Sequence, residues 1–122
     1  MGEEQNAPTD LGYLDEIYGV IENLAATEEH FLRTMGKTGD TKFAVMASEV
    51  RKIRSTIQQS VWRNNAGECW CIGKHLPLVS VRMMETAMKA TSLKKFDDAK
   101  MLMKNALEIK TLWMILAQGE VK

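Results

Sequence analysis

The sequence is poor in the residues that break helices or bridge segments of chain. Its 122 residues include two prolines, eight glycines and two cysteines, and aromatic residues make up 7% of the total. So few prolines and glycines argue against long loops. The cysteines, Cys69 and Cys71, are separated by a single residue and cannot readily bridge each other. We therefore expect no disulfide framework.

Long apolar runs are also missing. No run approaches the ~20 residues that a transmembrane helix needs. The polar and acidic start of the chain, Gly2-Glu3-Glu4-Gln5, does not resemble a signal peptide. We therefore expect no membrane partner and a location in the reducing cytoplasm.

An excess of charge of one sign is absent as well. The 16 basic and 16 acidic residues give a formal net charge of zero, whereas dedicated nucleic-acid-binding domains usually carry a basic excess. The charge is unevenly spread, because residues 1–35 sum to −7 while the rest of the chain is positive. An acidic first helix packed beside basic neighbours accounts for this. A weaker alternative is a nucleic-acid-associated surface formed by Arg51, Lys52, Arg54 and Arg63, for which binding should depend strongly on salt.

The residues that are abundant favour helices. Hydrophobic residues make up 45% of the chain, and they include nine methionines, which form helices well and pack adaptably. Apolar residues recur at spacings of three and four, which is typical of amphipathic helices. After a leader at residues 1–8, we predict one all-α domain at residues 9–122. It is an antiparallel up-down-up-down four-helix bundle with helices at about 10–35, 41–63, 68–91 and 94–118.

Local signals suggest where the first two helices begin, end and face the core. Thr9 or Asp10 can cap the first helix, and Gly36 is expected just past its end. In the second helix, the predicted buried stripe leaves the basic residues on the outer side. That stripe comprises Phe43, Met46, Val50, Ile53, Ile57 and Val61.

The third helix contains Pro77. Inside a helix, a proline at this position has no N–H to donate to the carbonyl of Gly73 and its ring clashes with that carbonyl. Either the helix runs through Pro77 with a kink, or it begins afresh there. The unbroken apolar stripe on both sides of Pro77 favours the kinked helix.

A candidate metal or thiol site lies in the same helix. Glu68, Cys71 and His75 share one helix face, and Cys71 and His75 at i and i+4 can reach one ion. Glu28, which interrupts the apolar stripe of the first helix, is the natural fourth ligand. The cofactor would be a single zinc or iron ion, and the alternative is that these residues only pack, with no cofactor. Arg82 follows on the same stripe and, with Cys71 and His75, suggests a pocket for a small anion.

The end of the fourth helix is apolar around its whole circumference. One core covers only part of a helix, so some of these residues should need a second chain to cover them. We therefore predict a homodimer, or a protein partner, at a surface that also includes two tryptophans from elsewhere. The predicted interface comprises Leu112, Trp113, Met114, Ile115, Leu116, Trp62 and Trp70. The alternative is a wider core closed by the N-terminal arm.

These observations favour a non-catalytic, self-associating interaction or scaffold module. A metal- or thiol-dependent enzyme or redox sensor at Cys71 and His75 is the second hypothesis, and the nucleic-acid-associated bundle is the third.

Overall fold

The computed structural model describes residues 10–119 and contains four helices, α2 (Leu11–Thr38), α3 (Lys42–Val61), α4 (Cys69–Ser92) and α5 (Phe96–Ala117). The prediction of an all-helical fold with four helices is confirmed. The predicted leader at residues 1–8 lies outside the described residues. None of the four helices is both long and apolar enough to span a bilayer, as judged over residues 10–119.

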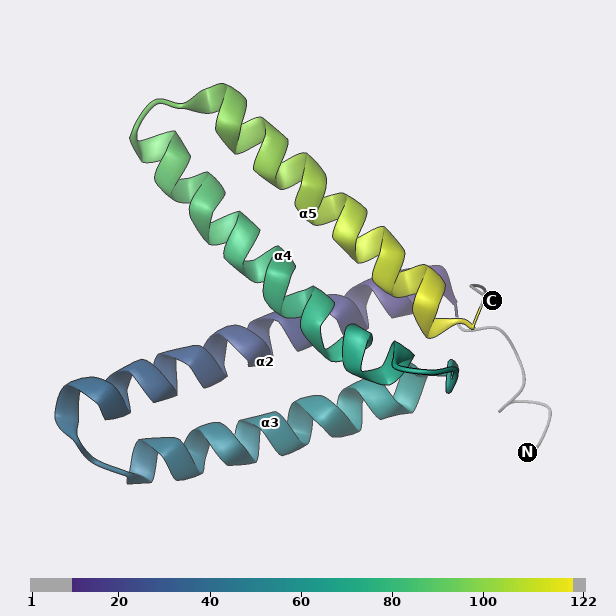
Figure 1. Ribbon diagram of the computed structural model, residues 1–122, viewed down its shortest axis with the longest axis horizontal. Helices are drawn as coiled ribbons and strands as arrows, with labels where there is room; N and C mark the ends of the chain where they lie inside the picture. Colours follow the sequence, from purple (N-terminus) through teal and green to yellow (C-terminus); the bar gives the residue numbers. More distant parts are fainter. Residues whose placement is uncertain (1–9, 120–122) are drawn as a thin grey trace.

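The helices form two hairpins that meet at one end and diverge at the other. Short turns join α2 to α3 and α4 to α5, and α4 passes across α2 where the hairpins meet (Figure 1). Away from the junction, each hairpin therefore consists of its own two helices, and within residues 10–119 no helix of the other hairpin packs against them. A two-helix hairpin cannot bury every apolar face of its helices. The arrangement itself predicts exposed apolar residues toward both hairpin tips.

The core lies at the junction of the hairpins. It is formed by buried residues from the N-terminal half of α2, the end of α3 and the end of α5, with half-buried residues of α4 packed against them. The buried residues are Leu14, Ile17, Tyr18, Ile21, Val61, Trp62, Trp113 and Ala117. The amide N–H of Arg63 donates to the carbonyl of Ala117 at 2.8 Å, which ties the end of α5 to the α3–α4 connection.

The ends of α2 follow from capping chemistry. The side chain of Asp10 accepts a hydrogen bond from the amide of Tyr13 at 3.0 Å, so Asp10 is the cap. The helix continues past Gly36 and ends at Thr38, so the predicted end at Gly36 was wrong. Gly39 has a φ of 73°, in the left-handed region, and its amide donates to the carbonyl of Met35 at 2.7 Å. Gly39 is therefore the glycine that terminates the helix.

The buried face of α3 differs from the predicted stripe. Met46 and Ile53 are exposed, whereas Ala47, Arg54 and Gln58 are buried. The prediction was wrong for these two residues because it ranked faces by hydrophobicity alone. The other members of the stripe are at least half-buried: Phe43, Val50, Ile57 and Val61. Buried Arg54 pairs with Glu28 of α2. Gln58 Nε2 donates to the carbonyl of Trp70 at 3.3 Å, whereas Gln58 Oε1 has no hydrogen-bond partner among the described residues.

Candidate functional site

The three tryptophans and Tyr18 pack together at the hairpin junction. The ring centroids of Trp62 and Trp113 are 5.6 Å apart, those of Tyr18 and Trp113 5.1 Å, and those of Trp62 and Trp70 6.2 Å. The Trp62–Trp70 and Tyr18–Trp113 pairs have the edge-to-face geometry that aromatic rings favour. These rings therefore connect α2, α3, α4 and α5.

Trp113 also resolves the difficulty that Pro77 creates in α4. The helix is continuous through Pro77, which removes the restart alternative, and a kink there stays a prediction. The indole N–H of Trp113 donates to the carbonyl of Gly73 at 3.0 Å. That carbonyl is the one that Pro77, lacking an N–H, leaves without a helix donor. A side chain on α5 thus completes the backbone hydrogen bonding of α4.

The structure divides the predicted interface residues into three groups: buried, half-buried and exposed. Trp113 has 0% exposed surface and Trp62 is also buried, so in this fold neither presents a surface to a partner. Trp70, Met114 and Leu116 are half-buried and pack against the core. The remaining two residues, Leu112 and Ile115, are exposed.

A chain of polar groups, buried at Tyr18 and Ser80 and half-buried at Glu22, links α2 to α4. The hydroxyls of Tyr18 and Ser80 are 2.6 Å apart, and Ser80 donates to Glu22 Oε2 at 2.8 Å. Because the Ser80 proton goes to Glu22, Tyr18 is the donor to Ser80. Burial raises the pKa of Tyr18, although the hydrogen bond with Ser80 opposes the shift. Burial likewise raises the pKa of Glu22, against the opposing effects of Ser80 and the Lys110 charge.

The candidate metal residues are not assembled into one site. Glu68 immediately precedes α4 and is exposed, Cys71 and His75 are exposed, and Cys69 and Cys71 are both unbridged. Within residues 10–119, no group of three or more His, Cys, Asp or Glu side chains is arranged to hold a metal ion. No ligand set for zinc or iron is therefore formed in the described part of the chain.

Glu28 instead neutralises a buried arginine. Arg54 Nη2 donates to Glu28 Oε1 at 3.1 Å, and Arg54 Nε donates to the other carboxylate oxygen. The side chains of Arg54 and Glu28 are 7% and 13% exposed. A bidentate pair of this kind satisfies both charges. It explains why a glutamate interrupts the apolar stripe of α2.

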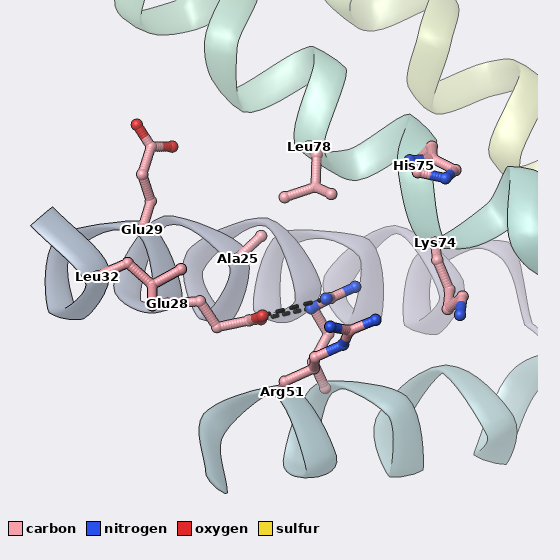
Figure 2. Close-up of a pocket in the computed structure, with 9 residues that line it drawn as sticks. Ala25, Glu28, Glu29, Leu32, Arg51, Lys74, His75 and Leu78 are labelled. Carbon is pink, nitrogen blue, oxygen red and sulfur yellow. Dashed lines mark hydrogen bonds and ion pairs between the residues drawn. The ribbon is translucent and has the colours of Figure 1, made fainter. Parts of the chain in front are cut away.

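This pair lies in a cavity of about 390 Å³ between α2, α3 and α4 (Figure 2). His75 lines the same cavity, whereas Cys71 and Glu68 do not. The complete lining is Ala25, Glu28, Glu29, Leu32, Arg51, Arg54, Lys74, His75 and Leu78.

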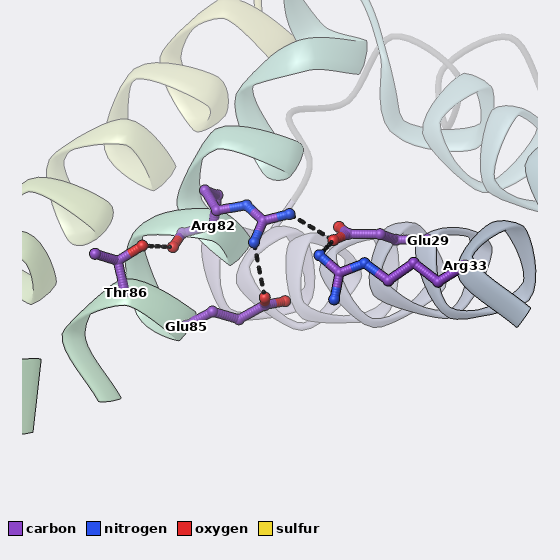
Figure 3. A network of polar contacts seen from close by, with 5 residues as sticks. All are labelled: Glu29, Arg33, Arg82, Glu85 and Thr86. Carbon is purple, nitrogen blue, oxygen red and sulfur yellow. Dashed lines mark hydrogen bonds and ion pairs between the residues drawn. The ribbon is translucent and has the colours of Figure 1, made fainter. Parts of the chain in front are cut away.

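Arg82 lies outside this cavity and is occupied by acidic partners. Its guanidinium contacts Glu29 of α2 and Glu85 of α4, the latter at 3.3 Å (Figure 3). Arg33 contacts the same Glu29 from one turn away. The predicted anion pocket of Cys71, His75 and Arg82 is therefore not present as one pocket. Arg82 instead helps to hold α4 against α2.

The four basic residues proposed for nucleic acid do not share a surface. Arg54 is buried against Glu28, Lys52 pairs with Glu49 on the outside of α3, and Arg51 lines the cavity. Arg63 lies in the connection after α3 and is half-buried.

Sequence reasoning missed Ser80 and Lys74. Ser80 interrupts the apolar stripe of α4, and a polar residue inside such a stripe is a signal for a buried partner. Lys74 adjoins His75, but only the crossing of α4 over α2 (Figure 1) brings it to the cavity that Arg51 also lines. That crossing has no local sequence signal.

Comparisons of this chain with protein families, with curated proteins and with solved structures give no match.

Proposed function

We propose that this chain is a non-catalytic interaction module that self-associates through α5, in the reducing cytoplasm. The observation that carries the proposal is the exposed side of α5. Met101, Leu112 and Ile115 are 52%, 51% and 37% exposed. They are spaced by about three turns and then one turn, so they lie on one side of the helix, away from buried Trp113. Stable monomers seldom leave such a stripe uncovered.

The charge pattern favours a second copy of the same chain as the partner. The formal net charge is zero, so two copies meet without overall repulsion. Lys104 and Glu108 lie one turn apart between Met101 and Leu112. Across a twofold axis near their midpoint, each lysine faces the glutamate of the other copy, which is the self-complementarity that an isologous interface requires. Both unbridged cysteines fit a reducing compartment.

Single glutamate substitutions test this interface. Leu112→Glu and Ile115→Glu each place a carboxylate in the proposed apolar contact, and burying an unpaired charge costs several kcal/mol. Since each 1.4 kcal/mol is tenfold in affinity, the dimer dissociation constant should rise at least ~100-fold. Both residues are exposed, so the fold should be unaffected.

Val45→Glu is the matched control, because Val45 is 62% exposed on α3, far along the chain from α5. Light scattering after size exclusion should give twice the chain mass for the unsubstituted protein and the control, and a single chain for the α5 variants. Dimers that persist in both α5 variants would contradict the proposed interface.

A further inference from the structure

The cavity between the hairpins contains more positive charge than its own residues neutralise. Its two carboxylates are both engaged, Glu28 by buried Arg54 and Glu29 by Arg33 and Arg82 (Figure 3). Arg51 and Lys74 form no ion pair with any residue between 10 and 119, although both line the cavity. The cavity therefore holds two cationic groups that no acidic side chain of the described residues offsets.

The two cations come from different helices on either side of the cavity. Arg51 rises from α3, and Lys74 extends from α4 toward α3 (Figure 2). His75 adds an imidazole from α4. The lining carries three cationic side chains and two carboxylates, so a net positive charge faces the cavity. Walled by protein, such an excess attracts counter-ions. An arginine presents a planar fork of donors to a phosphate, and a lysine adds a compact charge.

The rest of the lining is apolar. Ala25 and Leu32 of α2 and Leu78 of α4 contribute aliphatic surface beside the charged groups. A cavity of about 390 Å³ falls within the size range of small-molecule sites, which combine apolar walls with a few polar groups. An inorganic ion would leave the aliphatic wall unused. An organic anion would contact both parts of the lining.

We propose that this cavity binds a small organic phosphate. Arg51 and Lys74 hold the phosphate, and Leu32 and Leu78 contact the apolar part of the ligand. The buried Arg54–Glu28 pair forms a rigid, neutral base beneath the phosphate. This inference rests on the cavity alone and is independent of self-association through α5.

Phenyl phosphate is a suitable probe, because it carries a dianionic group on an apolar ring. Isothermal titration calorimetry with the full chain at low salt should show saturable binding of one probe per chain. Inorganic phosphate should bind about tenfold more weakly, because it gains nothing from the aliphatic wall. Arg51→Ala and Lys74→Ala should each weaken phenyl phosphate binding at least about tenfold, because each removes a hydrogen bond to a charged group.

Lys52→Ala is the matched control. It removes the same charge one residue from Arg51, but Lys52 is exposed and pairs with Glu49 outside the cavity. Its affinity for the probe should be unchanged, and Ile115→Glu should also bind normally. Circular dichroism confirms that each variant is folded. The proposal is overturned if millimolar phenyl phosphate gives no saturable binding, or if Lys52→Ala weakens binding as much as the two cavity variants do.

Discussion

Gly73→Ala is the substitution whose effect the structure predicts most sharply. Its two contributions to the free energy of unfolding, helix propensity and steric overlap, have opposite signs. In an ordinary helix interior, replacing glycine by alanine stabilises a protein by about 0.5–1 kcal/mol. At Gly73, however, the added methyl carbon would lie 2.4 Å from Cη2 of Trp62 and 2.8 Å from two further atoms of the ring. No carbon pair tolerates that separation, so the ring or the helix must move.

Trp62 has little room to move. Its indole N–H donates to the carbonyl of Asn64 at 2.7 Å, and its ring packs between Trp113 and Trp70. Overpacking of a filled core costs about 1–3 kcal/mol. The clash therefore outweighs the gain in helix propensity, and we expect Gly73→Ala to lower the free energy of unfolding by about 1–2 kcal/mol.

Gly19→Ala is the matched control, because Gly19 lies inside α2 and an added methyl group would meet nothing within 4 Å. It should raise stability by about 0.5–1 kcal/mol. Urea unfolding at one fixed chain concentration measures both variants, since self-association would otherwise shift the midpoints. Equal stabilisation by the two substitutions would refute the tight packing of Trp62 on Gly73.

Three further substitutions test the polar contacts, each by urea unfolding. Trp113→Phe removes the indole donor from the α4 carbonyl that Pro77 leaves unpaired, and should cost at least about 1–3 kcal/mol; a smaller loss would show that this hydrogen bond contributes little. Glu28→Gln leaves a buried arginine charge unpaired and should cost about 3–5 kcal/mol, whereas Glu49→Gln breaks an exposed pair and should cost less than about 1 kcal/mol. Glu22→Gln should stabilise the protein at pH 7, because a folded-state pKa above the ordinary 4.5 means that ionised Glu22 opposes folding. This gain in stability should vanish below pH 4.5, where Glu22 is protonated in both the folded and the unfolded chain. A gain that persists there would contradict the pKa shift.

The secondary structure was readable from the sequence because the four helices carry strong local signals. Asp10 caps α2, as its position before the first apolar repeat indicated. Errors arose where a choice depended on a partner elsewhere in the chain. Gly36 and Gly39 are both reasonable helix terminators, and the geometry of the turn selects the second.

Tertiary contacts explain the misassigned faces. Arg54 was placed outside α3 because an arginine is costly to bury, and it became buried because Glu28 meets it from α2. Trp113 was expected at an interface because the end of α5 is apolar on all sides. Instead, Trp113 packs against Tyr18 and Trp62 and donates to a carbonyl that Pro77 leaves unpaired on a different helix. The sequence near Trp113 contains no sign of these partners.

The cavity was anticipated only in part. His75 and Glu28 were singled out as candidate ligands, and both line it. Their chemistry was predicted as metal binding because sequence spacing relates residues within one helix. The crossing of the two hairpins brings Arg51 and Lys74 to the same cavity, and that angle depends on how the aromatic residues pack at the junction.

The most direct test of self-association is the mass of the unsubstituted chain in solution. Sedimentation equilibrium from about 1 to about 100 µM covers the affinities expected of a small interface. We expect the average mass to rise toward that of two chains and to go no further, because a twofold interface is closed. A mass equal to one chain across the whole range would contradict self-association.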